Sequence, residues 1–177
     1  MHTAILTRNI LDFAERYGKR TLSDPKKDHS QARWSGAKAL QFIENAISGY
    51  PVGVITVATD DTINNEILID GYQRLATLMG HPLCVEDTGH VIMWSMDHEA
   101  WVTAVDPGPR KIPLSSLWAA VLAHGLANAY AQIVEAMGEQ GSDALFEQFG
   151  RLSRVSIPTY LVENATGDEL DTIRKFL

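Results

Sequence analysis

The sequence has one cysteine, Cys84, among its 177 residues, and it has no long apolar run. A single cysteine excludes a disulfide within the chain and is typical of a reducing compartment. No apolar run approaches the roughly 18 residues of a membrane-spanning helix. The N-terminus does not show the basic-then-apolar pattern of a signal peptide. We therefore expect a cytoplasmic protein that does not bind membranes.

Positive charge is also scarce. The net charge is -7, from 15 basic and 22 acidic side chains, which argues against a protein that coats nucleic acid. Residues 1–50 nevertheless carry 8 basic and 5 acidic side chains, a net of +3, whereas residues 51–177 carry 7 and 17, a net of -10. The basic segment is either a solvated loop or a rim that attracts phosphate. Its members are Arg16, Lys19, Arg20, Lys26, Lys27, Arg33 and Lys38.

The composition is that of an ordinary globular protein, with 45% hydrophobic and 21% charged residues. At about 150 residues per domain, the length predicts one domain over residues 1–177. A chain this long buries about 70% of its unfolded surface and needs no disulfide or metal to fold.

Hydrophobic periodicity predicts an α+β fold. Helices are expected at residues 3–17, from Ser35 to Gly49, at 72–79, 115–137 and 143–152, and after Thr166, where Glu169 completes a capping box. Strands are expected at 52–58, 66–70, around 93–94 and 101–102 as an antiparallel pair, and at 155–162. Pro158 predicts that the last strand lies at a sheet edge. We expect a small mixed sheet built from residues 50–105, with helices before and after it.

One stretch points to chemistry: an apolar strand ends in Asp70-Gly71, and a helix begins at once. The first N–H groups of a helix have no intrahelical partners and can cradle an anion such as phosphate. Gly71 lets a ligand approach closely. Arg74, in the first turn, can fork onto phosphate oxygens. Asp70 can hold Mg2+ through water, because Mg2+ favours one or two carboxylates together with substrate phosphates.

The same residues also have a purely structural explanation. Asp-Gly after a strand is a common turn, and Asp70 can simply cap the helix. Arg74 can pair with a surface carboxylate. The spacing alone leaves both explanations open.

Three segments in this order resemble a known family. They are Gln31-Ala32-Arg33-Trp34-Ser35, then Gly49-Tyr50-Pro51-Val52-Gly53 after a helix, and then Asp70-Gly71-Tyr72-Gln73-Arg74-Leu75. The order is similar to that of the ParB-like N-terminal domain of GmrSD-type type IV restriction systems, with its Asp-Gly-Gln-Gln-Arg-Leu motif. The resemblance implies a ParB/sulfiredoxin-like fold. Its core covers about residues 28–105, with a helical insert or extension at about 113–152 and a closing strand and helix at 155–177.

The resemblance also implies a function. In the family, the fold binds a nucleoside triphosphate, and hydrolysis is coupled to a separate DNA-cleaving domain or subunit. Mg2+ is the expected companion of the nucleotide. The resemblance assigns hydrolysis to Asp70, Gln73 and Arg74. The positions expected to bind the nucleotide are Arg33, Asp70, Gly71, Tyr72, Gln73 and Arg74.

The sequence departs from the family pattern in the motif and at its end. Tyr72 replaces the first Gln, and a tyrosine can stack on a base or donate a hydroxyl but has no amide, which bears on hydrolysis more than on phosphate binding. The family continues with an Arg-x-Asn-x-x-Gly element, whereas this chain ends at Leu177, as expected of a shortened chain or a minimal stand-alone version. Related sulfiredoxins place a Cys beside the Arg of the equivalent turn, where this chain has Tyr72 and Gln73, so sulfinic-acid repair is not expected.

Three functions follow as hypotheses. The leading one is a nucleotide-binding ParB-like domain, hydrolysing or not, that regulates DNA restriction or phage defence. The alternative is a non-catalytic DNA-binding or adaptor module that retains the fold. DNA cleavage by this chain itself is the third, and no His-Asn-His segment or zinc spacing of histidines supports it. The oligomeric state is left open.

The remaining notable side chains are expected to be structural. Trp94, Trp101 and Trp118 should lie in the core, and Trp34 should anchor the preceding loop to the second helix. His81, which follows the motif helix, is either a core residue or faces the site.

Overall fold

The computed structural model describes residues 2–18, 22–23, 34–60, 65–81 and 90–176, which form an α+β protein. Its main sheet is mixed, with four long strands and a two-residue strand at one edge. In spatial order these are β1 (His2–Asn9), β8 (Ser156–Glu163), β3 (Ile55–Asp60), β4 (Asn65–Asp70) and β2 (Leu22–Ser23). The predicted α+β class is confirmed.

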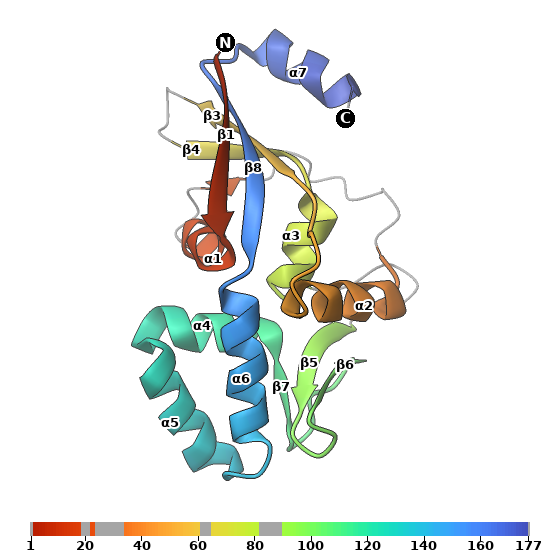
Figure 1. The fold of residues 1–177 in the computed structure, drawn as a ribbon, viewed down its shortest axis with the longest axis vertical. Helices are drawn as coiled ribbons and strands as arrows, with labels where there is room; N and C mark the ends of the chain where they lie inside the picture. Colours follow the sequence, from red (N-terminus) through yellow and green to blue (C-terminus); the bar gives the residue numbers. More distant parts are fainter. Residues whose placement is uncertain (1, 19–21, 24–33, 61–64, 82–89, 177) are drawn as a thin grey trace.

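A second, three-stranded antiparallel sheet has the order β6 (Ala100–Ala104), β5 (Val91–Ser95), β7 (Lys111–Pro113). The helices are α1 (Ile10–Gly18), α2 (Gly36–Ile47), α3 (Tyr72–Leu78), α4 (Leu114–His124), α5 (Leu126–Met137), α6 (Ser142–Ser153) and α7 (Gly167–Phe176). In Figure 1 the main sheet occupies one end of the molecule, and the second sheet with α4–α6 occupies the other.

The prediction that residues 50–105 supply the sheet is therefore wrong in part. The main sheet takes β1 and β8 from the two ends of the chain and pairs them with the β3–β4 hairpin. Residues 91–113 form the second sheet instead. Strand pairing between segments far apart in the sequence leaves no local signal in either segment.

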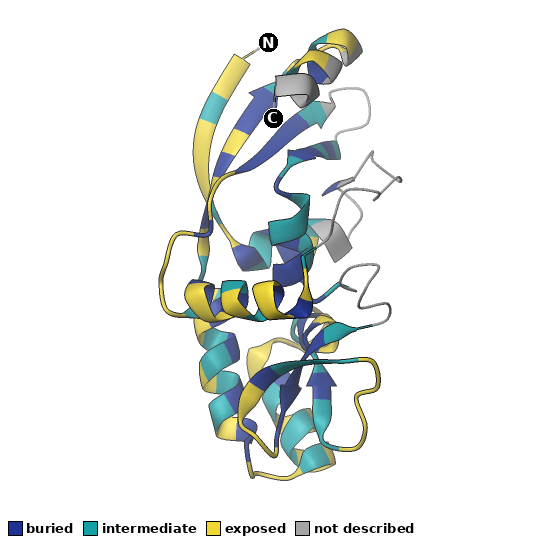
Figure 2. Cartoon of the chain, turned by 90° about the vertical axis from the view of Figure 1, so that its right-hand side faces the viewer, coloured by how far each residue is buried: buried dark blue, intermediate teal, exposed yellow. Residues whose placement is uncertain are grey.

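The prediction of one helix over residues 3–17 is wrong in its first half. Residues 2–9 form β1, which pairs antiparallel with β8 along its whole length. Threonine and isoleucine at positions 3, 5 and 7 suit a strand. Asn9 then caps α1, because its Oδ1 accepts a hydrogen bond from the N–H of Asp12 at 2.8 Å. Figure 2 shows β1 exposed along most of its length.

Strand β8 is central, which corrects the expectation that Pro158 marks a sheet edge. Pro158 lies opposite Thr7 of β1, and the parallel ladder with β3 begins one residue later, at Thr159. The proline therefore precedes the ladder on the β3 side, where its missing N–H removes no bond from the ladder.

The expected helix over residues 115–137 is two helices. It breaks at Gly125, whose φ of 75° and ψ of 163° belong to a backbone region open mainly to glycine. Helix α4 packs against the end of α3, where the Trp118 ring N–H donates to the carbonyl of Leu78 at 2.9 Å. The helical segment therefore packs at the end of α3 remote from Asp70.

Several local predictions are confirmed. Ser35 caps α2 by accepting from the N–H of Lys38, and Thr166 and Glu169 form the capping box of α7. Strands β5 and β6 pair with Trp94 opposite Trp101. Both of these rings and Trp118 are buried. Trp34 is half-buried and packs edge-on against Phe42 of α2, with ring centroids 4.9 Å apart.

Apolar residues lie on both faces of the main sheet. One face joins the large core, through Ile55, Val57 and Leu68 against α1 and α3. The opposite face carries a small cluster in which α7 packs over the sheet, with members Ala58, Ile69, Val162 and Leu170. Helix α7 therefore covers part of the second face.

Candidate functional site

The Asp-Gly-Tyr-Gln-Arg motif lies where strand β4 meets helix α3. Asp70 is the last residue of β4, Gly71 is the N-terminal cap of the helix, and Tyr72 is its first residue. Asp70 lies opposite Thr56 of β3, beside an irregularity in the ladder between Thr56 and Val57. Such bulges redirect side chains at the end of a strand.

Gly71 turns the chain from the strand into the helix. Its φ is 94°, a left-handed conformation that side chains disfavour. A Cβ atom at this position would approach a side-chain carbon of Ile55 to 2.8 Å. Glycine is therefore required here by both its backbone and its surroundings, independently of any ligand.

Arg74 joins two of the segments that carry the family resemblance. Its Nη2 donates to Oδ2 of Asp70 at 2.9 Å, one helical turn away. Its guanidinium also lies over Gly53, the last residue of the Gly-Tyr-Pro-Val-Gly segment. A Cβ at Gly53 would come within 2.5 Å of Arg74 Nη1. The structure thus brings together Gly53, Asp70 and Arg74 beside the start of α3.

The structure tests the two structural explanations of the motif, that Asp70 caps the helix and that Arg74 pairs with a surface carboxylate. Among the described residues no side chain caps α3, so Asp70 is not a helix cap. The carboxylate that pairs with Arg74 is Asp70 itself. The side chain of Asp70 is 43% exposed and that of Arg74 is 25% exposed, so both ions are accessible to a ligand.

The backbone at the start of α3 is arranged as the sequence predicts. The first intrahelical hydrogen bond runs from the N–H of Leu75 to the carbonyl of Gly71. The N–H groups of Tyr72, Gln73 and Arg74 precede that bond. They belong to the first turn, where the partial positive charge of a helix lies.

Tyr72 and Gln73 are half-buried. Tyr72 packs against the large hydrophobic core, so its ring is in part a structural contact. Tyr72 therefore lacks the amide that the family motif has at this position, and part of its ring faces the protein interior. Arg33, the other expected phosphate contact, lies outside the described residues, as does Cys84.

His81 lies beyond the other end of α3. It is half-buried, and burial lowers the pKa of its imidazole below the ordinary value, because the charged form is poorly solvated there. It lies three positions after Leu78, whose carbonyl accepts the Trp118 bond, so His81 belongs with the packing of α4 rather than with Asp70.

A charge network that the sequence analysis did not foresee crosses beneath the main sheet. Arg8 of β1 donates two hydrogen bonds to Glu66 of β4, both at 2.7 Å. Arg16 lies 3.3 Å from the same carboxylate, and Asp12 lies 3.0 Å from Arg16. The bonds to Glu66 raise the pKa of the Arg8 guanidinium above its ordinary value. Arg8 and Glu66 are 58 residues apart, so no sequence spacing indicates the pair.

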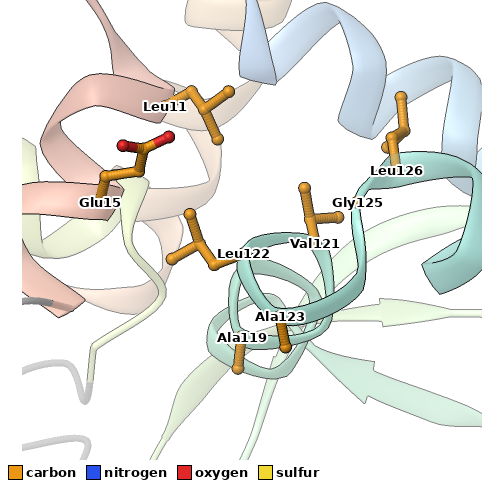
Figure 3. A pocket seen from close by; sticks show the side chains of 8 residues that line it. All are labelled: Leu11, Glu15, Ala119, Val121, Leu122, Ala123, Gly125 and Leu126. Carbon is orange, nitrogen blue, oxygen red and sulfur yellow. The ribbon is translucent and has the colours of Figure 1, made fainter.

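The structure also has an apolar hollow of about 610 Å³ between α1 and the α4–α5 turn. Figure 3 shows Leu11 and Glu15 of α1 on one side and Val121, Leu122 and Leu126 on the other. No residue of the motif lines it. The hollow is therefore separate from the candidate site.

A metal cluster is not found in the described part of the chain. No group of three or more His, Cys, Asp or Glu side chains there could hold a metal ion. Asp70, as a single carboxylate, fits the mode in which Mg2+ takes most of its ligands from phosphates and water. Within the same residues, no helix is long and apolar enough to cross a membrane.

Comparisons with other proteins add no assignment. No family model, curated protein or solved structure matches this chain.

Proposed function

We propose that this chain is a nucleoside-triphosphate-binding, ParB-like domain that regulates DNA restriction or phage defence. The observation that carries the proposal is the position of Arg74. Two segments of the resemblance, one before and one after the β3–β4 hairpin, meet at its guanidinium: Gly53 lies beneath it and Asp70 pairs with it.

The chemistry of the site suits a polyphosphate. Arg74 has further N–H donors beyond the one that bonds Asp70, and a guanidinium matches phosphate oxygens in pairs. Asp70 is the carboxylate that would hold Mg2+ through water, and the ion would supply charge neutralisation of the phosphates. Gln73 would position the attacking water if hydrolysis occurs. In this proposal, a separate domain or subunit cleaves the DNA.

Calorimetric titration with ATP, GTP, CTP and UTP, with and without Mg2+, tests the proposal. One charge-assisted hydrogen bond contributes about 1.5–3 kcal/mol, so Arg74→Ala should weaken binding about 10- to 150-fold. The matched control is Arg151→Ala, which removes an arginine from another i,i+4 ion pair, with Glu147 of α6. That variant should bind as the wild type does. Equal affinity of the Arg74 variant, or a folded wild type that binds none of the four nucleotides, would overturn the proposal.

A second candidate is the non-catalytic DNA-binding or adaptor module. Tyr72 favours it, because this side chain has no amide and packs against the core. Two measurements distinguish the candidates: phosphate release in the presence of Mg2+, and DNA binding without nucleotide over a range of salt concentrations. Binding to DNA should fall steeply with salt if basic side chains contact its phosphates. Phosphate release that Arg74→Ala abolishes would exclude the non-catalytic candidate.

A further inference from the structure

Strand β1 forms a long outer edge of the main sheet. It has eight residues, and in the described part of the chain β8 is the strand that pairs with it. In an antiparallel ladder every second residue directs its N–H and C=O groups toward the partner strand, so the alternate residues of β1 direct theirs outward. Such a row of outward backbone groups is a template for another strand. Figure 2 shows β1 exposed at the rim of the molecule.

Strand β1 does not have the features that usually protect a sheet edge. Proteins protect edges with lysine, with proline, with bulges or by making the edge strand very short. Residues 2–9 contain no lysine and no proline, and their register with β8 runs without a shift. Strand β2, at the opposite edge, has only two residues. Strand β1 is therefore the edge of the main sheet that can accept a partner strand.

Two large apolar side chains of β1 are exposed. Ile5 is 76% exposed and Leu6 is 37% exposed, and they lie on opposite faces of the sheet because side chains alternate along a strand. Tyr160 of β8 lies directly opposite Ile5 and is itself 37% exposed. A partner strand that covers this edge must therefore be apolar on both of its faces.

The sequence of β1 is complementary to itself. Residues 3–7 read Thr-Ala-Ile-Leu-Thr, so the order of threonine and apolar residues is the same in both directions. A twofold axis that passes beside Ile5, perpendicular to the sheet, makes a second copy of β1 antiparallel to the first and keeps the two faces of the sheet in register. Ile5 then lies opposite Ile5 of the second copy, Ala4 opposite Leu6, and Thr3 opposite Thr7. Apolar pairs and threonine pairs stabilise antiparallel strands, and residues 3–7 carry no charge that would oppose a like charge.

We infer that β1 pairs with β1 of a second copy of this chain, so that the two main sheets form one continuous sheet in a twofold dimer. Closed dimers of this kind use the same surface of both copies. On one face, the two Ile5 side chains meet between the two Tyr160 rings, and on the other face each Leu6 meets an Ala4. Strands β8 and β3 lie between β1 and β4, the strand that ends in Asp70, so the inference does not depend on the proposed nucleotide site.

Sedimentation velocity over a range of protein concentrations tests the inference. The wild type should sediment as a dimer that dissociates on dilution. Ile5→Lys should be monomeric at the concentrations where the wild type is dimeric, because the twofold axis places two like charges opposite each other. Ile5→Glu should be monomeric for the same reason. An equimolar mixture of the two variants should form dimers again, because each lysine then lies opposite a glutamate.

A control variant distinguishes this edge from the other exposed apolar surface. Leu126→Lys introduces the same charge at a residue that is 43% exposed beside the apolar hollow, and it should dimerise as the wild type does. Because Ile5 is exposed, Ile5→Lys should unfold in urea as the monomeric wild type does, which shows that the variant is folded. A wild type that is monomeric at every concentration would overturn the inference. A dimer that persists in Ile5→Lys, or that only Leu126→Lys disrupts, would do the same, and a mixture that stays monomeric would contradict pairing centred on Ile5.

Discussion

The ion pair between Arg8 and Glu66 leads to a specific prediction about the free energy of unfolding. Both side chains are almost fully enclosed, at 11% and 10% exposure, and they share two hydrogen bonds of 2.7 Å. Replacing one partner of a buried pair leaves the other charge without compensation, which costs about 3–5 kcal/mol. We therefore expect Arg8→Ala to be strongly destabilising.

A neighbouring arginine narrows the loss of stability expected for Arg8→Ala. Arg16 remains 3.3 Å from Glu66 after the substitution and compensates part of its charge, although Arg16 is itself 36% exposed. The loss should therefore fall near the lower end, at about 3 kcal/mol. Replacing both partners by apolar residues, as in Arg8→Met with Glu66→Leu, removes both charges. That double variant should recover most of the loss, because apolar replacements of buried pairs are often neutral or stabilising.

Urea unfolding followed by circular dichroism measures these differences, with Arg151→Ala as the reference. Arg151 pairs with Glu147 at 2.6 Å, but the two side chains are 55% and 61% exposed. A pair this exposed contributes about 0.3–0.5 kcal/mol. If Arg8→Ala costs no more than Arg151→Ala, the reasoning from burial is wrong. If the double variant is as unstable as the single one, the loss comes from packing rather than from the unpaired charge.

Two further predictions follow from the backbone and from titration. Gly53→Ala and Gly49→Ala both place a side chain at positive φ, 79° and 84°, and each should lose about 1–3 kcal/mol in urea unfolding. Only the Cβ at 53 would meet Arg74, since nothing lies within 4 Å of one at 49, so nucleotide affinity should fall for Gly53→Ala alone. Burial lowers the pKa of His81, so the unfolded chain takes up a proton near pH 6.5 before the folded one does. The free energy of unfolding therefore has its full value above that pH, and it decreases as the pH falls below it because protonation then favours the unfolded chain. Unfolding free energies between pH 5 and 8 should show this loss in the wild type relative to His81→Gln.

The sequence predicts those features that neighbours along the chain determine. The capping box at Thr166 and Glu169 follows from its fixed spacing. The apolar stripe of α6 at Leu145, Phe149 and Leu152 follows from helical periodicity, and all three are buried.

Features set by distant pairing were not predictable in this way. Leu6 matches the helical spacing of Ile10 and Phe13, yet it belongs to a strand because β8 pairs with it from the other end of the sequence. A glycine such as Gly125 is compatible with a helix and with a break, and packing decides between them. The contact of Gly53 with Arg74 depends on how the β3–β4 hairpin places α3.

The order of strands in the main sheet has a consequence for folding. The β3–β4 hairpin and the turn into α3 close over short loops, and they can form as soon as that part of the chain exists. Strand β8 reaches its place between β1 and β3 about a hundred residues later, and such long-range pairing is slow. During synthesis, the edge of β3 that pairs with β8 in the folded protein therefore has no partner strand until β8 has left the ribosome. In this interval the β3 edge is exposed to strands of other chains, and the period before β8 inserts is when aggregation is most favoured.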